Sequence, residues 1–479
     1  MTRQPALLFT LVLLGTVASA NTLYWGGGNT TIPNGTLLPN AITSLPGTWD
    51  LTTANWSTTT NGVTYTNWPS TGTANAAYIG YGLATTPTGI GYITQAVNMA
   101  LNQLTVVGPA FNENFQLTAT SPVSLTLNGS TPTITLAFAN SSPGYYYLLL
   151  LPNVALAGTN GFTQTGMGAL RVSSDCSGLR GTVVVSPGSQ TLSLESGGKL
   201  TGVDSFTVQV YPGDPGGFVV QPPSAGSRDD MGDASVVRLQ GGEFTYAGYR
   251  HATSPSTESI GSIVLDSWGE LNPTSANGSG QNGRLYTGID RGPNGKGTLT
   301  VGGLRTGPDF ATDIIVTNQP TGVILPWMQN SRGYALWLTG TGAITNMPWT
   351  PAPRDLSAWQ ANQDYRSVPA SGSADPFLNA ISTDLTIHSL GAEINGNNLN
   401  NQVITIGTTN TLIVSSGYIG LGNGGGYVQF AHDYGRYPHH DHQRPLFVCR
   451  PPGRIPLHLF RDHRRNQCGD RGRGRSKWC

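Results

Sequence analysis

Short runs in which apolar and polar residues alternate dominate the chain between about residue 100 and residue 430. Examples are Val123–Leu127 (VSLTL), 206–210 (FTVQV) and 297–301 (GTLTV). Turn-forming residues such as Asn128-Gly129 separate the runs, and apolar residues with helical spacing are almost absent. This pattern predicts an all-β chain built from many short strands.

The low charge of these strands favours one particular all-β architecture. Only 10% of the residues are charged. In a parallel β-solenoid, equivalent positions of successive turns stack on one another, so like charges repel, whereas Thr, Ser and Asn stack without that cost. We therefore predict a parallel β-solenoid (β-helix) over residues 101–430. A string of antiparallel β-sandwiches is the alternative, and it would show sharper linkers.

Two segments depart from this pattern. Residues 21–100 contain Trp25, Trp49, Trp56 and Trp68, and we expect them to form a Trp-rich N-terminal cap and the first strands. Residues 325–377 contain six prolines and four tryptophans, namely Trp327, Trp337, Trp349 and Trp359. We expect this second segment to leave the solenoid and to offer a binding surface.

The N-terminus has the features of a secretory signal. Arg3 is followed by an apolar stretch over 6–15 and by the small residues Ala18, Ser19 and Ala20. Residues 1–20 are thus expected to be a signal peptide of a protein exported to the outer cell surface or the extracellular space. Later apolar runs are too short for a transmembrane helix in the mature chain.

The composition changes abruptly after Phe430. Up to that residue the charge is 14 basic minus 21 acidic, or −7, and residues 431–479 carry 11 minus 4, or +7. Codons for His, Asp, Tyr and Asn become mostly Thr or Ile codons when shifted by one base, which matches the composition of the body. We interpret 431–479 as out-of-frame translation and expect it to be disordered. The alternatives are a metal site at His432, His439, His440 and His442, or a basic arm for nucleic acid or membrane.

Cysteine usage agrees with this interpretation. Three of the four cysteines lie in the segment 431–479, which we interpret as out-of-frame translation. These are Cys449, Cys468 and Cys479, and they lack a zinc-binding spacing. Cys176 then stands alone, and we expect it to be a buried small apolar residue.

Several segments resemble a known group of proteins. Residues 47–57 (GTWDLTTANWS), 239–248 (LQGGEFTYAG) and 322–337 (with GVILPWM and GYALW) carry the likeness. They resemble bacterial exported proteins with autotransporter-associated β-strand repeats. The resemblance implies a passenger-like parallel β-helix, often held at the cell surface by a C-terminal barrel or sorting segment.

Candidate chemistry is sparse. Residues 228–233 (RDDMGD) could supply oxygen ligands for Ca²⁺, although Asp next to Gly is also ordinary turn chemistry. The basic side chains Lys199, Lys296, His251 and His388 form no recognisable constellation, and His251 is expected to be a surface residue. Gly424–Gly426 precedes a strand rather than a helix, which argues against a phosphate loop. We assign no catalytic, cofactor-binding or metal-binding residue.

These observations favour a non-catalytic exported or cell-surface β-helix protein of structural or adhesive type. Its expected partners are extracellular polysaccharide or cell-surface components, and nucleic acid is not expected. One alternative is a polysaccharide lyase or hydrolase, which needs converging acidic or basic groups on one solenoid face. The other is a carbohydrate-binding protein that uses the tryptophans between 327 and 359 as stacking platforms.

Overall fold

The computed structural model describes residues 21–25, 47–58, 65–69, 75–79, 91–108, 115–138, 147–209, 217–224, 226–278, 281–293, 295–302, 312–322, 324–330, 335–346, 350–351, 355–367, 379–387, 389–392, 402–407, 409–414, 419–421 and 428–433. Within these ranges the only helix is a 3₁₀ turn, Leu356–Ala358, so the all-β prediction is confirmed. The chain divides into two compact units, Met1–Pro348 and Trp349–Cys479.

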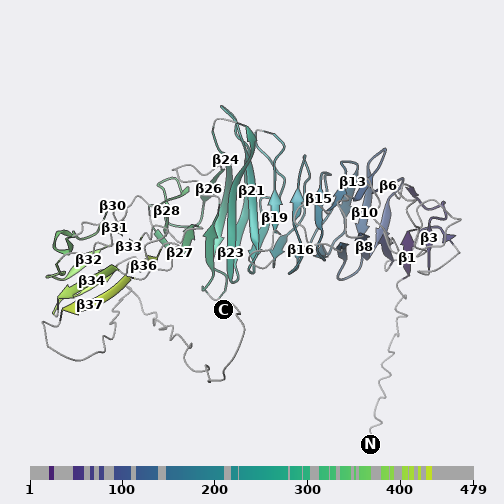
Figure 1. Cartoon of the computed structure of the whole chain (residues 1–479). Helices are drawn as coiled ribbons and strands as arrows, with labels where there is room; N and C mark the ends of the chain where they lie inside the picture. Colours follow the sequence, from purple (N-terminus) through teal and green to yellow (C-terminus); the bar gives the residue numbers. More distant parts are fainter. Residues whose placement is uncertain are drawn as a thin grey trace, which may run out of the picture. The chain divides into compact units, whose positions relative to one another are not determined.

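The first unit is a parallel β-solenoid with two long sheets (Figure 1). Sheet A contains, in spatial order, β26 (Thr312–Val316), β24 (Gly283–Asp290), β22 (Thr257–Leu265), β20 (Val236–Leu239), β18 (Ser205–Val208), β16 (Thr182–Val185), β14 (Phe162–Thr165), β11 (Thr133–Phe138), β8 (Gln103–Gly108), β5 (Ala76–Ile79), β1 (Thr22–Trp25), β3 (Trp56–Ser57) and β4 (Tyr65–Thr66). Sheet B contains β2 (Thr48–Trp49), β6 (Gly91–Gln95), β9 (Phe115–Thr118), β12 (Tyr147–Leu150), β15 (Ala169–Val172), β17 (Leu192–Leu194), β19 (Phe218–Val220), β21 (Glu243–Arg250), β23 (Trp268–Gly278), β25 (Thr298–Val301), β27 (Ile324–Asn330), β28 (Ala335–Leu338) and β29 (Ile344–Asn346).

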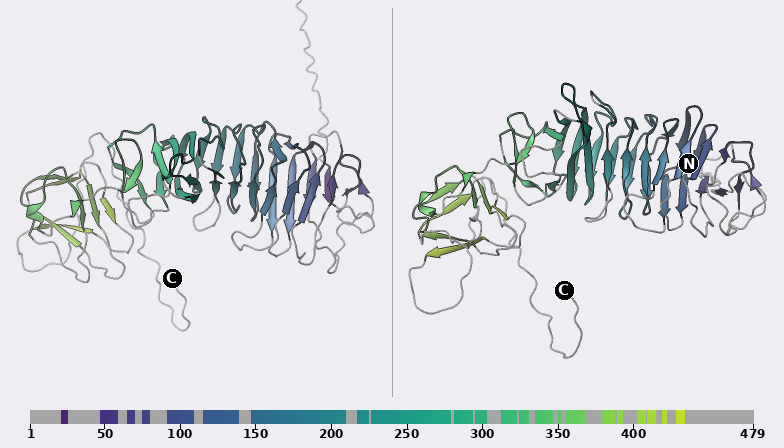
Figure 2. Two further views of the ribbon diagram at one scale, coloured as in Figure 1. Left: turned by 90° about the horizontal axis from the view of Figure 1, so that it is seen from above. Right: turned by 45° about the horizontal axis from the view of Figure 1, so that its top comes forward.

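Successive turns place one strand in sheet A and the next in sheet B. A short third sheet, sheet C, adds β7 (Met99–Leu101), β10 (Val123–Leu127) and β13 (Val154–Ala157). Isolated parallel bridges such as Leu200 to Met231 continue the line of contacts between later turns. The strands stay stacked along one direction in both further views, as expected for a solenoid (Figure 2).

Alternation within each strand builds one elongated core. In β10, for example, Val123, Leu125 and Leu127 are buried, whereas the residues between them are partly exposed. A continuous apolar cluster extends through the first unit, and the rings of Phe206, Phe218 and Phe244 stack inside it. The prediction of a mostly β-strand chain with one elongated apolar core between residues 101 and 304 is confirmed.

The outer faces carry the polar stacks that the composition predicted. The hydroxyl oxygens of Thr135 and Thr165 lie 2.9 Å apart on adjacent turns, and those of Thr182 and Ser205 are also 2.9 Å apart. Neutral hydroxyls donate and accept in turn, so they join neighbouring turns without charge repulsion.

Antiparallel strands close both ends of the first unit. At the N-terminal end, β1 pairs antiparallel with β3, and β3 pairs antiparallel with β4. The buried indoles of Trp25, Trp49, Trp56 and Trp68 pack there with ring centroids 4.7–5.1 Å apart. At the other end, β27, β28 and β29 form antiparallel pairs. The predicted tryptophan cap is confirmed, and at each end one of the two long sheets finishes in antiparallel strands, which interrupts the parallel ladder there.

Cys176 is buried among these turns, as expected for a small apolar residue. Its sulfur accepts a hydrogen bond from the backbone N–H of Leu156 at 3.0 Å. Burial raises the pKa of the Cys176 thiol to about 11, so the thiol stays protonated and unreactive at neutral pH.

The second unit is a smaller parallel β-structure. Its sheets are β30 (Thr350–Pro351), β31 (Asp364–Ser367), β33 (Ser389–Ala392) and β36 (Ile419–Leu421), then β32 (Leu385–Ile387) with β35 (Leu412–Val414), and β34 (Gln402–Gly407) with β37 (Val428–Asp433). A separate apolar cluster that includes Trp359 and Tyr365 holds this unit together. The segment 325–377, expected to leave the solenoid, spans the division between the units at Pro348.

The strand β37 extends past the compositional boundary. It pairs with β34 from Val428 to Asp433, so Ala431, His432 and Asp433 continue the ladder, contrary to the expectation that order ends at Phe430. Backbone hydrogen bonds tolerate any side chain except proline, and β34 still offers partners at these positions. Residues 434–479, including the predicted disorder and His439, His440 and His442, lie outside the described residues.

Candidate functional site

The outer face of sheet B brings acidic, amide and aromatic side chains together at β21, β23, β25 and β27. These four strands are consecutive and parallel. Glu243 pairs with Glu270, and Glu270 pairs with Thr300. Because side chains alternate between faces with a period of two, Trp268, Glu270 and Asn272 of β23 share the outer face.

Two glutamates are stacked on this face. Adjacent strands lie about 4.8 Å apart, which brings the half-buried side chains of Glu243 and Glu270 close together. The hydroxyl of Thr245 and the side-chain amide of Asn272 donate hydrogen bonds to Oε1 of Glu243, at 2.7 and 3.0 Å. Burial, and secondarily the charge of Glu243, raise the pKa of Glu270.

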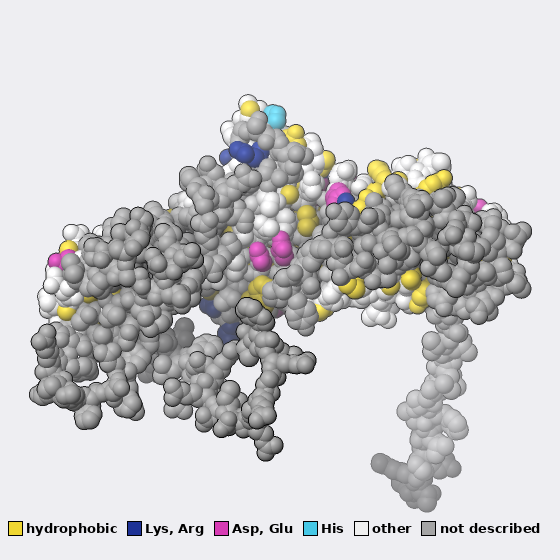
Figure 3. All heavy atoms as spheres, in the orientation of Figure 1, with side chains coloured by type: hydrophobic (Ala, Val, Ile, Leu, Met, Phe, Trp, Pro, Cys, Tyr) yellow, Lys and Arg dark blue, Asp and Glu magenta, His cyan; other side chains and the backbone are white. Residues whose placement is uncertain are grey.

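The described residues provide no cationic partner for this pair. Their four ion pairs involve Arg171, Arg228, Arg238 and Arg284 and include neither glutamate. The carboxylate of Glu270 lies close against Gly302, since a Cβ at that position would be 2.7 Å from Oε1 of Glu270. Figure 3 shows acidic side chains exposed over the region of β21 and β23.

Two partly exposed indoles lie on one side of the row of positions that contains the glutamates, Trp268 on the same strand as Glu270 and Trp327 two strands further along. Trp268 lies against Gly241, where the ring atoms are 3.4–3.6 Å from the position that a Cβ would take. Gly241 has a φ of +89°, a conformation that glycine adopts without strain. The absence of a side chain there lets the ring lie along the sheet.

By the alternation of β27, Trp327 faces outward two strands further along, where its half-buried ring also packs against the apolar core. It directly precedes Met328, which is buried and pairs with Leu299. The guanidinium carbon of Arg291 lies 5.7 Å from the Trp327 ring centroid, and Nε of Arg291 donates to the Gly297 carbonyl at 3.0 Å. This contact orients the indole through a cation–π interaction.

We call the set Glu243, Glu270, Trp268, Trp327, Asn272 and Arg291 the indole–carboxylate surface. Indole faces pack against apolar ring faces, and carboxylates and amides hydrogen-bond hydroxyl and amino groups. Sugars present both kinds of group, with apolar C–H faces and polar rims. The arrangement is therefore chemically suited to a carbohydrate.

The segment 228–233, considered as a calcium loop, has a different arrangement. Arg228 forms a 2.9 Å ion pair with the buried Asp230, while Asp229 and Asp233 are exposed. Within the described ranges, no group of three or more His, Cys, Asp or Glu side chains could hold a metal ion. The partner of the Asp230 carboxylate is the guanidinium of Arg228.

A buried carboxyl group of β22 joins this segment to the next turn. Glu258 accepts hydrogen bonds from the backbone N–H groups of Asp230 and Met231, at 3.1 and 3.2 Å. Burial raises the pKa of Glu258 to about 8, and it also raises the pKa of the nearby Tyr246. Because Glu258 is 1% exposed, this cluster has a structural role between turns.

The other sequence candidates are scattered. His251 is exposed, as predicted, and its Nδ1 accepts from the backbone N–H of Ser254 at 3.1 Å. Lys296 is exposed in the turn before β25, and Lys199 lies close enough to Asp230 to affect its pKa. His388 and Gly424–Gly426 lie outside the described residues.

The tryptophans between 327 and 359, proposed as stacking platforms, have different surroundings within the two units. Trp327 lies on the outer face of sheet B, and Trp337 is half-buried in β28. Trp359 is buried in the other unit and stacks on Tyr365 with ring centroids 4.7 Å apart. Trp349 lies outside the described residues.

Sequence reasoning missed most of the indole–carboxylate surface. Glu243 and Glu270 are 27 residues apart (270 − 243) and Trp268 and Trp327 are 59 apart (327 − 268), so no local motif links them. The one available signal was the Gly-Gly pair at 241–242, which marks close backbone approach within a strand.

No helix among the described residues is long and apolar enough to cross a membrane. No family model, curated protein or solved structure matches the chain.

Proposed function

We propose that this chain is a non-catalytic, exported or cell-surface β-helix protein of adhesive type that binds polysaccharide through the indole–carboxylate surface. The carrying observation is the juxtaposition of Trp268 and Trp327 with the hydrogen-bonded Glu243 on one outer face. The rest of the solenoid acts as a rigid scaffold, because its polar ladders satisfy one another.

The spacing of the indoles supports a polymeric ligand. Trp268 and Trp327 lie two strand spacings apart, or about 10 Å along the solenoid axis. This spacing is comparable with the length of a disaccharide unit. A polysaccharide running along the axis would then place alternate sugars on the two rings.

The same proposal includes export of the chain and its relationship to proteins with autotransporter-associated β-strand repeats. Support comes from the signal-like residues 1–20 and from the resemblance carried by residues 47–57. Cell fractionation of the native host checks this part, and recovery of the chain with its first 20 residues intact in the cytoplasm would contradict it.

Native affinity electrophoresis of the full chain in gels containing soluble polysaccharides tests the binding function. Replacing both Trp268 and Trp327 with Ala should weaken binding roughly 10- to 100-fold, since each aromatic contact contributes about 0.5–1.5 kcal/mol. The matched control is Tyr92→Ala, because Tyr92 is also exposed on sheet B but lies in β6. Equal retardation of the native protein, the double Ala variant and the Tyr92→Ala variant would contradict the proposal.

A carbohydrate-active enzyme is the second candidate, and the Glu243–Glu270 pair favours it. Carboxylates of glycoside hydrolases lie roughly 5–10 Å apart, and adjacent strands provide a comparable spacing. Release of reducing ends from a bound polysaccharide, abolished by Glu243→Gln, would support this function over simple adhesion.

A further inference from the structure

We propose that the indole–carboxylate surface selects polysaccharides of amino sugars, holding a protonated amine between the carboxylates of Glu243 and Glu270. This inference rests on the proposed function, because it names the class of glycan that the same surface binds. It concerns specificity, and adhesion to neutral glycans does not depend on it.

The repulsion between Glu243 and Glu270 is the first observation that favours a cationic ligand. Stacked like charges on adjacent strands destabilise a sheet, and Glu243 and Glu270 are directly paired. Two hydrogen-bond donors already occupy Oε1 of Glu243, but neither brings a positive charge. A cation placed between the carboxylates would remove their repulsion.

The raised pKa of Glu270 also favours a positive charge at this position. Partial burial and the neighbouring Glu243 raise the pKa of Glu270, so without a ligand the site favours the addition of a proton. A bound ammonium group would supply the same positive charge and leave both carboxylates ionised.

The geometry favours an ammonium group over a metal ion. Calcium takes six to eight oxygen ligands, whereas the described residues here offer two carboxylates, and no three-ligand acidic group exists in the described chain. An ammonium group donates three hydrogen bonds, which two carboxylates can accept.

The adjacent indoles favour an amino sugar over a free amine. Trp268 and Glu270 lie two residues apart on the same face, so a sugar ring stacked on the indole presents its substituents toward the carboxylates. Indoles also attract cations through their ring faces. Uronate or sulfated polymers would instead bring negative charge onto the glutamate pair, so the surface should reject them.

Equilibrium binding of the full chain to three probes tests the inference: chitosan oligosaccharides, their N-acetylated counterparts, and polygalacturonate, in mildly acidic low-salt buffer. We expect chitosan to bind at least tenfold more tightly than the acetylated probe, and polygalacturonate to bind most weakly. Glu243→Gln/Glu270→Gln should abolish this preference, because it should weaken binding of chitosan at least tenfold more than binding of the acetylated probe. The control is Asp266→Asn, which removes a carboxylate that lies just after β22 and pairs with Arg238 of sheet A.

The possible outcomes separate the two proposals. Equal affinity for chitosan and the acetylated probe, or a preference that survives in the double Gln variant, overturns the amino-sugar inference while glycan adhesion stands. Failure of all three probes to bind, together with a negative result on the wider polysaccharide gels, overturns the proposed function itself. Circular dichroism of each variant establishes that the solenoid is folded.

Discussion

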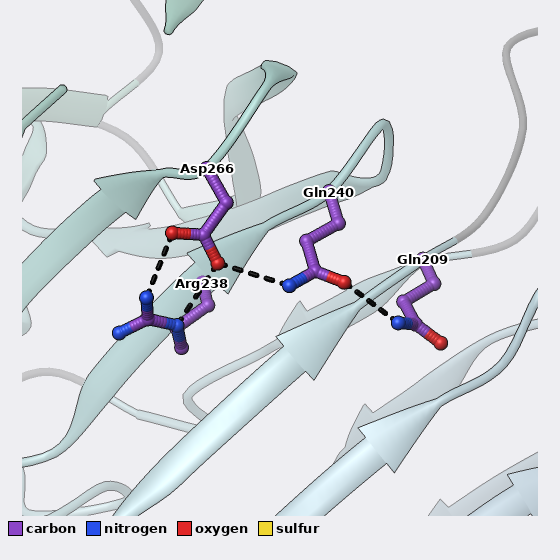
Figure 4. A network of polar contacts seen from close by, with 4 residues as sticks. All are labelled: Gln209, Arg238, Gln240 and Asp266. Carbon is purple, nitrogen blue, oxygen red and sulfur yellow. Dashed lines mark hydrogen bonds and ion pairs between the residues drawn. The ribbon is translucent and has the colours of Figure 1, made fainter. Parts of the chain in front are cut away.

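Two clusters of polar side chains, one at β20 of sheet A and one at β21 and β23 of sheet B, differ in how their charges are balanced. On sheet A, Nε and Nη2 of Arg238 donate to both carboxylate oxygens of Asp266, at 3.0 and 2.7 Å. Asp266 also accepts from Gln240 at 2.9 Å, and Gln240 accepts from Gln209 at 2.6 Å (Figure 4). On sheet B, by contrast, two carboxylates are stacked on each other.

The balance of charge distinguishes a network that stabilises the solenoid from a surface that can bind a ligand. The network of Arg238, Asp266, Gln240 and Gln209 links neighbouring turns and satisfies its own charges. The Glu243–Glu270 pair has unbalanced negative charge beside two partly exposed indoles. An external group can therefore gain interaction energy on sheet B that sheet A already uses internally.

Phe218→Ala should have the largest effect, because it removes the shared support of both faces. Phe218 is fully buried and stacks with Phe206 and Phe244 at centroid distances of 4.5 and 5.5 Å. We expect the free energy of unfolding to fall by about 3–5 kcal/mol, measured by denaturant titration. Tyr92→Ala, which removes an exposed ring, is the control. A loss no greater than that of the control would contradict the assigned core.

Glu258→Gln tests how a buried carboxyl group, unlike the surface glutamates Glu243 and Glu270, makes the stability of the solenoid depend on pH. The pKa of Glu258 is raised from 4.5 to about 8 in the folded protein, so between these pH values the folded state retains a proton that the unfolded state loses. The stabilisation is complete below pH 4.5 and is lost as pH rises toward 8. It amounts to a few kcal/mol in order of magnitude.

The Gln variant should abolish this part of the pH dependence, because an amide does not titrate. Urea titrations at the two ends of the window, on the native protein and the variant, measure the difference. Parallel pH profiles for the two proteins would show that Glu258 is ionised in the folded state.

Gly241→Val should displace the Trp268 ring from sheet B. A non-glycine residue at the φ of +89° costs about 1–2 kcal/mol, and the added methyl groups would meet the indole. Gly188→Val is the matched control, since Gly188 has a φ of +79° but no atom within 4 Å of an added Cβ. Both variants should lose similar stability, but only Gly241→Val should weaken glycan binding. Equal binding by both would remove Trp268 from the site.

Arg238→Ala should have the smallest effect. Its side chain is 38% exposed in the pair with Asp266, and exposed ion pairs contribute at most about 1 kcal/mol. Denaturant titration should show a loss within that range, with glycan binding unchanged. A clear loss of binding would mean that sheet A also contacts the ligand.

The sequence by itself determined the local secondary structure and which side chains of each strand are buried. The alternation of Val123, Leu125 and Leu127 predicted a strand with one buried face, since a period of two is a local property. The same reasoning predicted the tryptophan cap, the buried Cys176 and the low-charge outer ladders. Each depends on the composition of one segment.

Only the tertiary structure decided which side chains of different turns meet. The stacking of Glu243 on Glu270, and of Trp268 on Gly241, depends on strand register. The turns vary in length: from Phe206 to its partner Val237 is 31 residues (237 − 206), but from Val237 to Ile263 is 26 (263 − 237). Register is set by packing of the shared core and by turn geometry, so residues far apart in sequence form the candidate site only after the turns have stacked.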